Sequence, residues 1–231
     1  MNKTVKIIVE VLLFAAIVGL VYALYASIMK PVNFNKEKAA REVVAVQRLK
    51  DIRTLQVALK SVTGKFTGSA DSLKLFYETG KMKINMQIGS SDDSLAVAHT
   101  AAVKKKLGKK ANNAELFELY KAGDQNLVFT IEHEINVKDT LFNNRPDFCV
   151  DSLKYIPFSG GQEVIMDAVV RQVSGVPVPL FEACMPYKAL LKGLDNQLRI
   201  NLDAERRDQN KYEGLMVGSV TAPNNNAGNW E

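Results

Sequence analysis

A run of apolar residues close to the N-terminus is the clearest pattern in the chain. Residues 7–28 read IIVEVLLFAAIVGLVYALYASI, with Glu10 as the only charged residue. As an α-helix this run would extend about 33 Å, enough to cross the hydrocarbon core of a bilayer. Tyr22 and Tyr25 fall near its downstream end, where amphipathic rings favour the headgroup layer. The pattern predicts a short tail and one transmembrane helix within residues 1–30, with both tyrosines as interface anchors.

The same run has a second interpretation, as a secretory signal that is removed. Lys3 and Lys6 would form its positive n-region, and Val21-Tyr22-Ala23 is a tolerable cleavage pattern. The apolar run continues past this point, however, and exceeds the ~7–15 apolar residues of a signal peptide. The length therefore favours an anchor that is retained.

Two charge patterns bear on the side of the membrane on which the rest of the chain lies. Short tails that carry lysine usually stay in the cytoplasm, whereas the segment after the helix is itself basic. Its positive residues are Lys30, Lys36, Lys38, Arg41 and Arg48. Because long domains cross membranes largely regardless of their charge, we favour a cytoplasmic N-terminus in the inner membrane and an extracytoplasmic body.

An amphipathic helix is predicted after a break in the Pro-Val-Asn-Phe-Asn sequence at residues 31–35. Apolar residues recur there at spacings of three or four, within a segment 31–63 that Gly64 ends. The apolar face includes Val46, Leu49, Ile52, Leu55 and Leu59. This face either packs on the chain's own core or forms a self-associating stalk, and its irregular spacing argues against a long two-stranded coiled coil.

The remaining segment, 64–231, alternates in a way that predicts an α+β body. The sequence predicts helices over residues 94–107, 114–121 and 186–194, and strands over residues 81–88, 127–139, 152–158, 163–173, 176–184 and 214–220. Turn residues separate the later strands. We expect a mainly antiparallel sheet with helices on one face.

Composition predicts a folded body, and the charge pattern predicts no nucleic-acid partner. Hydrophobic residues are 47% and charged residues 24%, typical of a globular chain. The net charge of +5 is spread along the sequence, and the densest basic run, residues 104–110, carries no interleaved aromatic residues. We read this run as a solvated helix end, with contact to anionic lipid as the alternative.

No motif indicates an enzyme, a metal centre or a cofactor site. Glu132 and Glu134 alternate with His133 along a predicted strand, so they point to the opposite face. We expect no catalysis, no cofactor and no small-molecule substrate. Cys149 and Cys184 form either one disulfide or two separate thiols.

Two residues of the apolar run, Glu10 and Gly19, are candidates for contacts between helices. An ionisable group in a bilayer costs a few kcal/mol and usually has a partner, although hydration near the tail is an alternative for Glu10. Gly19 permits close approach of a second backbone. We expect both residues to mediate helix contacts in the membrane.

A glutamate near the helix start, a glycine nine residues on and an amphipathic continuation resemble the N-terminal helix of type IV pilins and type II secretion pseudopilins. In that family the helix holds subunits in the membrane and packs them into a filament. Val5 and Lys6 stand where the family is cut after a glycine, so the processing site is missing. The family's pairing of the glutamate with a neighbour's N-terminal amine therefore does not carry over.

Together these features predict a single-pass, membrane-anchored structural or interaction subunit of a cell-envelope assembly. Its partners would be membrane lipid and either other envelope proteins or further copies of the chain. Trp230, near the C-terminus, is a candidate docking residue or else an exposed side chain on a polar tail. The alternative function is an exported binding module with a removed signal or a simple tether.

Overall fold

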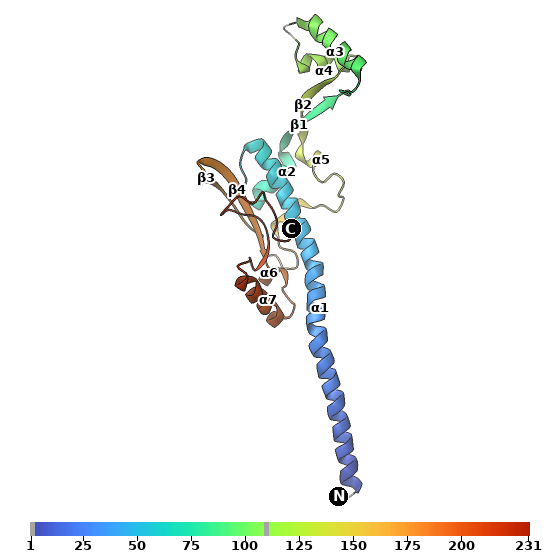
Figure 1. The fold of residues 1–231 in the computed structure, drawn as a ribbon, viewed down its shortest axis with the longest axis vertical. Coiled ribbons are helices and arrows are strands. Elements are labelled where there is room, and N and C mark those ends of the chain that lie inside the picture. Colours follow the sequence, from blue (N-terminus) through green and yellow to red (C-terminus); the bar gives the residue numbers. More distant parts are fainter. Residues whose placement is uncertain (1–2, 109–110) are drawn as a thin grey trace. The chain divides into compact units, whose positions relative to one another are not determined.

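A computed structural model describes residues 3–108 and 111–231, with the backbone alone at residues 3–6, 8 and 9. The fold is α+β, as predicted, and contains two separate antiparallel sheets among these residues (Figure 1). The elements in chain order are α1 (Lys3–Thr63), α2 (Ala70–Thr79), β1 (Lys81–Ile88), α3 (Ser94–Leu107), α4 (Asn113–Lys121), β2 (Phe129–Asn136), α5 (Val137–Thr140), the 3₁₀ helix η2 (Val150–Lys154), β3 (Ile165–Val173), β4 (Val176–Pro186), α6 (Tyr187–Leu190), α7 (Asn196–Asp208) and β5 (Gly214–Gly218).

Helix α1 is 61 residues long and continues through Pro31. The break predicted at residues 31–35 is therefore wrong. Proline lacks one N–H and costs a helix interior about 3 kcal/mol, but the residues on either side keep their own hydrogen bonds. Packing also stabilises the helix beyond Pro31, because the Phe34 side chain is buried there, with 7% of its surface exposed. One helix thus connects the apolar run to the body.

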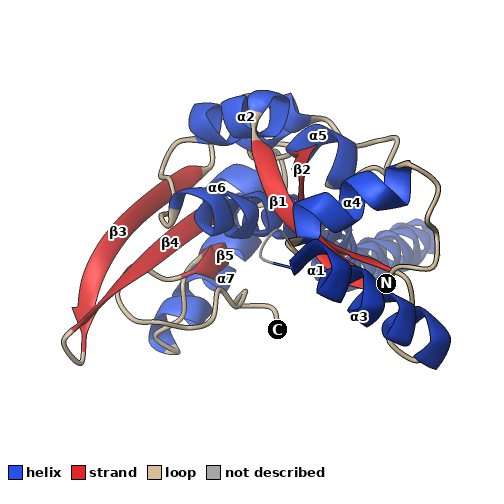
Figure 2. Cartoon of the chain, turned by 90° about the horizontal axis from the view of Figure 1, so that it is seen from above, coloured by secondary structure: helices blue, strands red, loops and turns tan. Residues whose placement is uncertain are grey.

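The chain forms two compact units. Unit 1 contains the chain up to Val57, Lys65–Asp71 and Cys149–Glu231. Its sheet has the order β3-β4-β5, and β3 pairs with β4 from Ile165 opposite Cys184 to Val173 opposite Val176. Seen along α1, the sheet lies beside this helix (Figure 2).

The predicted apolar face of α1 is mostly buried within the chain. Leu49, Ile52 and Leu55 are 0% exposed, whereas Val46 and Leu59 are half-buried. Complete burial of such a side chain contributes about 1.5–3 kcal/mol. This arrangement favours packing on the chain's own core over the self-associating stalk.

The strand predicted over residues 152–158 is wrong. The 3₁₀ helix η2 occupies the start of this segment, and a single antiparallel bridge joins Tyr155 to Glu163. Pro157 has no N–H to donate to a ladder, and the chain turns at residues 157 and 158 instead. The buried Ser159 hydroxyl closes the following turn by donating to the Ile156 carbonyl over 2.7 Å.

Unit 2 contains residues 58–64 and 72–148. Its sheet is the antiparallel pair β1-β2, and its core includes Ile88, Leu116, Leu127 and Phe129. Side-chain oxygens cap the N-termini of α3 and α4. Asp93 accepts from the N–H groups of Leu95 and Ala96, and Asn112 accepts from that of Glu115.

Truncation of one buried residue of α1 tests this packing. We expect Leu49→Ala to lower the free energy of unfolding of the body by about 2–5 kcal/mol, because it leaves a cavity. Val43→Ala is the matched control, since Val43 is 71% exposed on the same helix, and should change it by less than about 0.5 kcal/mol. Urea denaturation of the detergent-solubilised full chain measures both. Equal losses in the two variants would contradict the packing.

Candidate membrane and partner surfaces

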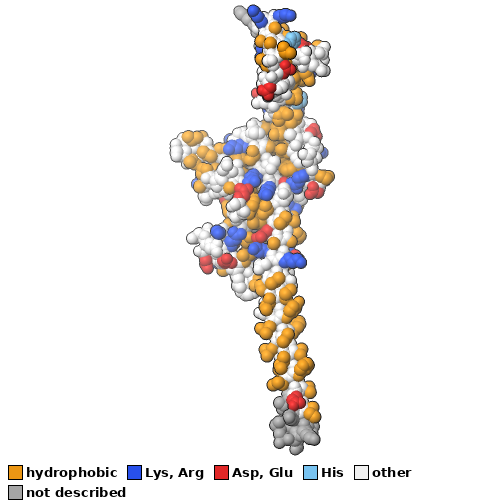
Figure 3. All heavy atoms as spheres, turned by 45° about the vertical axis from the view of Figure 1, so that its right-hand side comes forward, with side chains coloured by type: hydrophobic (Ala, Val, Ile, Leu, Met, Phe, Trp, Pro, Cys, Tyr) orange, Lys and Arg blue, Asp and Glu red, His pale blue; other side chains and the backbone are white. Residues whose placement is uncertain are grey.

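The N-terminal part of α1 is uncovered and apolar. From Glu10 onward, α1 contains an 18-residue window of mean hydropathy 2.4, and none of this window is buried inside the described chain. On the face shown in Figure 3, hydrophobic side chains cover this part of the helix. Tyr22 and Tyr25, the predicted interface anchors, are 73% and 62% exposed. The segment is long and apolar enough for a single-pass membrane anchor.

The two predicted contact residues of this segment lie on opposite faces. Glu10 is exposed, and a Cβ built on Gly19 meets no atom of the described chain within 4 Å. Nine residues at 100° per residue place them about 180° apart around the helix. The Glu10 side chain and the bare backbone at Gly19 therefore cannot both face the same neighbouring helix.

Gly19 belongs to a wider surface of small residues, which we call the small face. The residues of the small face are Ala15, Ala16, Gly19, Ala23, Ala26 and Ser27. They fall within an arc of about 120°, and bulky residues occupy the rest of the circumference between 15 and 28. Small residues let helix backbones approach closely in a bilayer. The small face is not among the predicted sites, although the spacing of four from Ala15 to Ser27 carries its signal.

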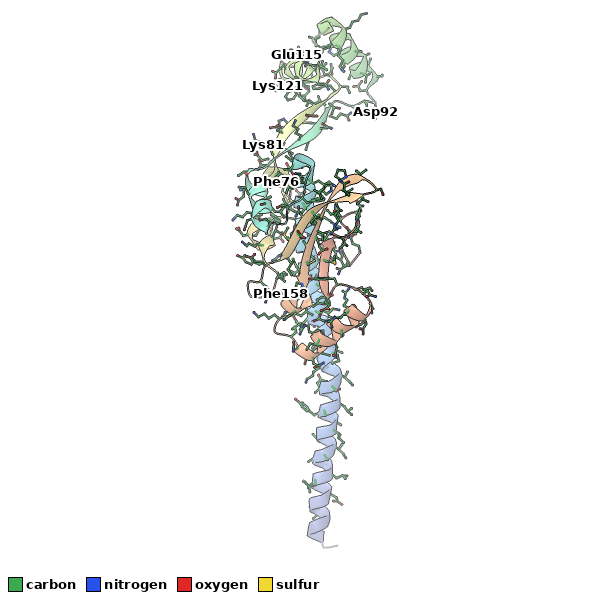
Figure 4. The ribbon with its side chains drawn as sticks, turned by 90° about the vertical axis from the view of Figure 1, so that its left-hand side faces the viewer. Phe76, Lys81, Asp92, Glu115, Lys121 and Phe158 are labelled. Atoms are coloured by element: carbon green, nitrogen blue, oxygen red, sulfur yellow. The ribbon has the colours of Figure 1, made fainter. Side chains whose placement is uncertain are left out.

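Arg41 connects the middle of α1 to the last residue of α6 and to the loop that follows it. Its Nη1 donates to the carbonyl oxygens of Leu190 and Lys192 over 3.1 and 2.9 Å. The guanidinium carbon lies 5.0 Å from the centroid of the Phe158 ring, which projects beside α1 (Figure 4). Carbonyl acceptors and an aromatic face suit a guanidinium group, so this contact orients the C-terminal part of unit 1 on the helix.

Tyr187 makes a second connection, from the start of α6. Its buried hydroxyl donates to Glu42 Oε1 over 2.6 Å and accepts from Arg206 Nη2 over 2.7 Å. Burial and the adjacent Glu42 carboxylate raise the pKa of Tyr187. The Tyr187 hydroxyl thus links α1 and α7. No local motif could predict this contact, because Glu42 and Tyr187 are 145 residues apart.

The C-terminal tail binds the chain's own sheet. Gly218 N–H donates to Ala227 O, and Asn229 N–H donates to Met216 O, each over 3.0 Å. The Trp230 ring lies against Gly228, where an added Cβ would be 2.3 Å from it, and its Nε1 is buried with no hydrogen-bond partner among the described residues. Trp230 is therefore half-buried against its own chain.

The two cysteines are free thiols, Cys149 exposed and Cys184 buried. The structure shows the separate thiols and not the disulfide. Burial is the main cause that raises the pKa of Cys184, and the Glu182 carboxylate adds to it. The Cys184 thiol is thus held in its neutral, unreactive form, while Cys149 is accessible.

Within the described residues, no group of three or more His, Cys, Asp or Glu side chains could hold a metal ion. His133 lies opposite Ile84 in the β1-β2 ladder, and Glu134 lies opposite Lys83. The basic run ends α3 with lysines in its last turn, where cations favour the helix dipole. Lys109 and Lys110 of this run lie outside the described residues.

Alkaline pH tests the Tyr187 connection. The folded state favours the neutral phenol, so its contribution is full below the unfolded tyrosine pKa of about 10 and is lost as pH rises through the raised folded value. Tyr187→Phe should lower the melting temperature at pH 7 and flatten its fall between about pH 9 and 11. The control is Tyr155→Phe, at a residue that is 42% exposed. Parallel pH profiles for all three proteins would refute the connection.

Comparison with protein families, curated proteins and solved structures finds no match to this chain. The likeness to pilins and pseudopilins therefore consists of layout alone, a long apolar N-terminal helix followed by an α+β body.

Proposed function

We propose that this chain is a single-pass, membrane-anchored structural subunit of a cell-envelope assembly, pilin-like or a scaffold of a secretion platform. The main support for this proposal is that one continuous helix, α1, has an exposed apolar part and a part that is buried against the body. Helix α1 is apolar and exposed at Leu13, Phe14 and Leu20, and is fully buried from Leu49 to Leu55 on its body-facing side. A rigid element of this kind transmits the position of a membrane anchor to a folded body.

Lipid is the environment that suits the uncovered part of α1. Each bulky residue there leaves about half or more of its surface exposed, and exposed apolar area costs about 25 cal/mol per Å² in water. Contiguous apolar surfaces of this size mark membrane or protein contacts. A bilayer covers the whole circumference of a single helix at once.

Helix contacts within the membrane are the second part of the proposal. With Tyr22 and Tyr25 in the headgroup layer, Glu10 lies about 20 Å below them, inside a hydrocarbon core of about 30 Å. This depth favours a paired carboxyl group over a hydrated one. The small face supplies a separate surface for a neighbouring copy or another envelope protein.

Fractionation together with thiol labelling tests anchoring and orientation. We expect the intact chain to stay in membranes after a high-salt wash and to be released by detergent. A membrane-impermeant maleimide should label Cys149 in intact cells, because this thiol is exposed on the body. Cys149→Ser is the control and should abolish labelling. A soluble chain beginning near Leu24 would support the exported binding module instead.

Substitution of Glu10 tests the contacts within the membrane. Glu10→Leu should reduce the size of the detergent-extracted assembly without reducing membrane insertion, because it removes the polar group that needs a partner. Phe14→Leu, about one turn further along, is the control. Gly19→Leu should also reduce assembly by blocking the small face, whereas Val21→Leu adds bulk to the opposite side. Unchanged oligomer size on a native gel for both Glu10→Leu and Gly19→Leu would contradict the proposal.

A further inference from the structure

A hollow of about 510 Å³ lies where α7 begins beside α1. We call it the α1–α7 hollow. Its lining consists of Ala23, Ala26, Ser27, Lys30 and Pro31 from α1, and Asp195, Gln197 and Leu198 from the start of α7. Both helices belong to unit 1. The volume lies within the range of about 300–1,000 Å³ that is usual for ligand sites.

The continuity of α1 fixes the height of this hollow relative to a bilayer. Hydrocarbon of about 30 Å needs about 20 helical residues, which, counted from Ile7, end at Ala26. From Ala23 the start of α7 lies across from α1, and Ala26 is already half-buried. The polar residues of α7 cannot enter hydrocarbon without cost, so the hollow lies in the headgroup layer.

The lining combines an apolar floor with one positive and one negative side chain. Ala23 and Ala26 form part of the side nearest the membrane, and Lys30 supplies an ammonium group above them. Asp195 accepts from the Leu198 N–H over 3.0 Å, and a carboxylate has further acceptor positions. An occupant with an apolar end, a phosphate and a hydrogen-bond-donating cation complements these groups.

The position of α7 also argues against a second transmembrane helix as the occupant. Ala23, Ala26 and Ser27 belong both to the small face and to the hollow. A parallel helix packed on the small face would meet Asp195 and Gln197 at this level. It can therefore contact the lower part of the small face, near Ala15 and Gly19, but cannot continue through the hollow.

We propose that the α1–α7 hollow binds one phospholipid with a primary amine in its headgroup, of the ethanolamine type. The phosphate pairs with Lys30, the ammonium group donates to Asp195, and the acyl end runs down along Ala23. The proposal rests on the membrane anchoring of α1. The bound lipid fills the space between anchor and body and fixes the body on the membrane surface.

Native mass spectrometry of the detergent-solubilised full chain tests this site. Phosphatidylethanolamine, phosphatidylcholine and phosphatidylglycerol with identical acyl chains are added at equal concentration. We expect preferential retention of phosphatidylethanolamine over phosphatidylcholine, whose quaternary amine has no N–H to donate. Equal retention of these two lipids would overturn the proposal, and preference for phosphatidylglycerol would show a general anionic surface instead.

Three variants test whether the preference for phosphatidylethanolamine arises in the α1–α7 hollow. Lys30→Gln should lower phosphatidylethanolamine retention about fivefold, the effect expected of one lysine near a membrane. Asp195→Asn keeps a good helix cap and should remove the preference over phosphatidylcholine. Ala26→Leu fills the hollow and should reduce retention of every lipid. Lys36→Gln is the control for charge, because Lys36 is exposed on α1 outside the hollow.

The outcomes separate this site from the proposed function. An anchored chain that shows no lipid preference overturns the site alone. A chain that leaves washed membranes overturns the anchor, whatever it binds in micelles. If Ala26→Leu changes oligomer size and leaves lipid retention unchanged, the hollow belongs to a contact between copies and the lipid proposal fails.

Discussion

One unbroken helix has to satisfy two environments, and the rest of the structure depends on this constraint. From Val11 to Ile28, α1 exposes bulky apolar side chains around most of its circumference. Further along the same helix, Leu49, Ile52 and Leu55 are buried against the body. A helix satisfies its own backbone hydrogen bonds, so the change of environment along α1 costs no backbone partner. Side-chain polarity alone then distinguishes the part of α1 that is suited to lipid from the part that packs on protein.

Polar contacts as well as apolar packing hold α6 and the segments next to it against α1. Arg41 and Glu42 are neighbours on the helix, and they bind opposite ends of the short α6 region through Leu190 and Tyr187. Apolar packing has no strong directional preference, whereas these hydrogen bonds hold one rotation of the α6–α7 part of unit 1 about the helix axis. A fixed rotation means that the small face and the start of α7 always lie on the same side of α1, which gives the anchor a defined orientation beneath its body.

Periodicity predicted the elements whose side chains alternate between two environments. The strands around Ile84 and Val169 and the helix caps at Asp93 and Asn112 follow from local patterns, and the structure has them. Pro31 predicts a break, but α1 continues through it, because packing that begins at the buried Phe34 offsets the loss of one backbone hydrogen bond. The Tyr187 contact and the hollow at Lys30 could not be predicted, because they join segments far apart in the chain, and register between such segments is set by tertiary packing.

The opposite placement of Glu10 and Gly19 constrains any assembly built through the anchor. A contact made by the small face alone, repeated on a second copy, is self-complementary and closes into a dimer. A contact in which Glu10 of one copy meets a different surface of the next is heterologous, and it continues into a ring or a filament. Because the two residues lie about 180° apart, a copy that uses both has a neighbour on each side. The geometry of α1 therefore allows either a closed dimer, through the small face alone, or an extended assembly. Only the extended assembly requires a contact made by Glu10.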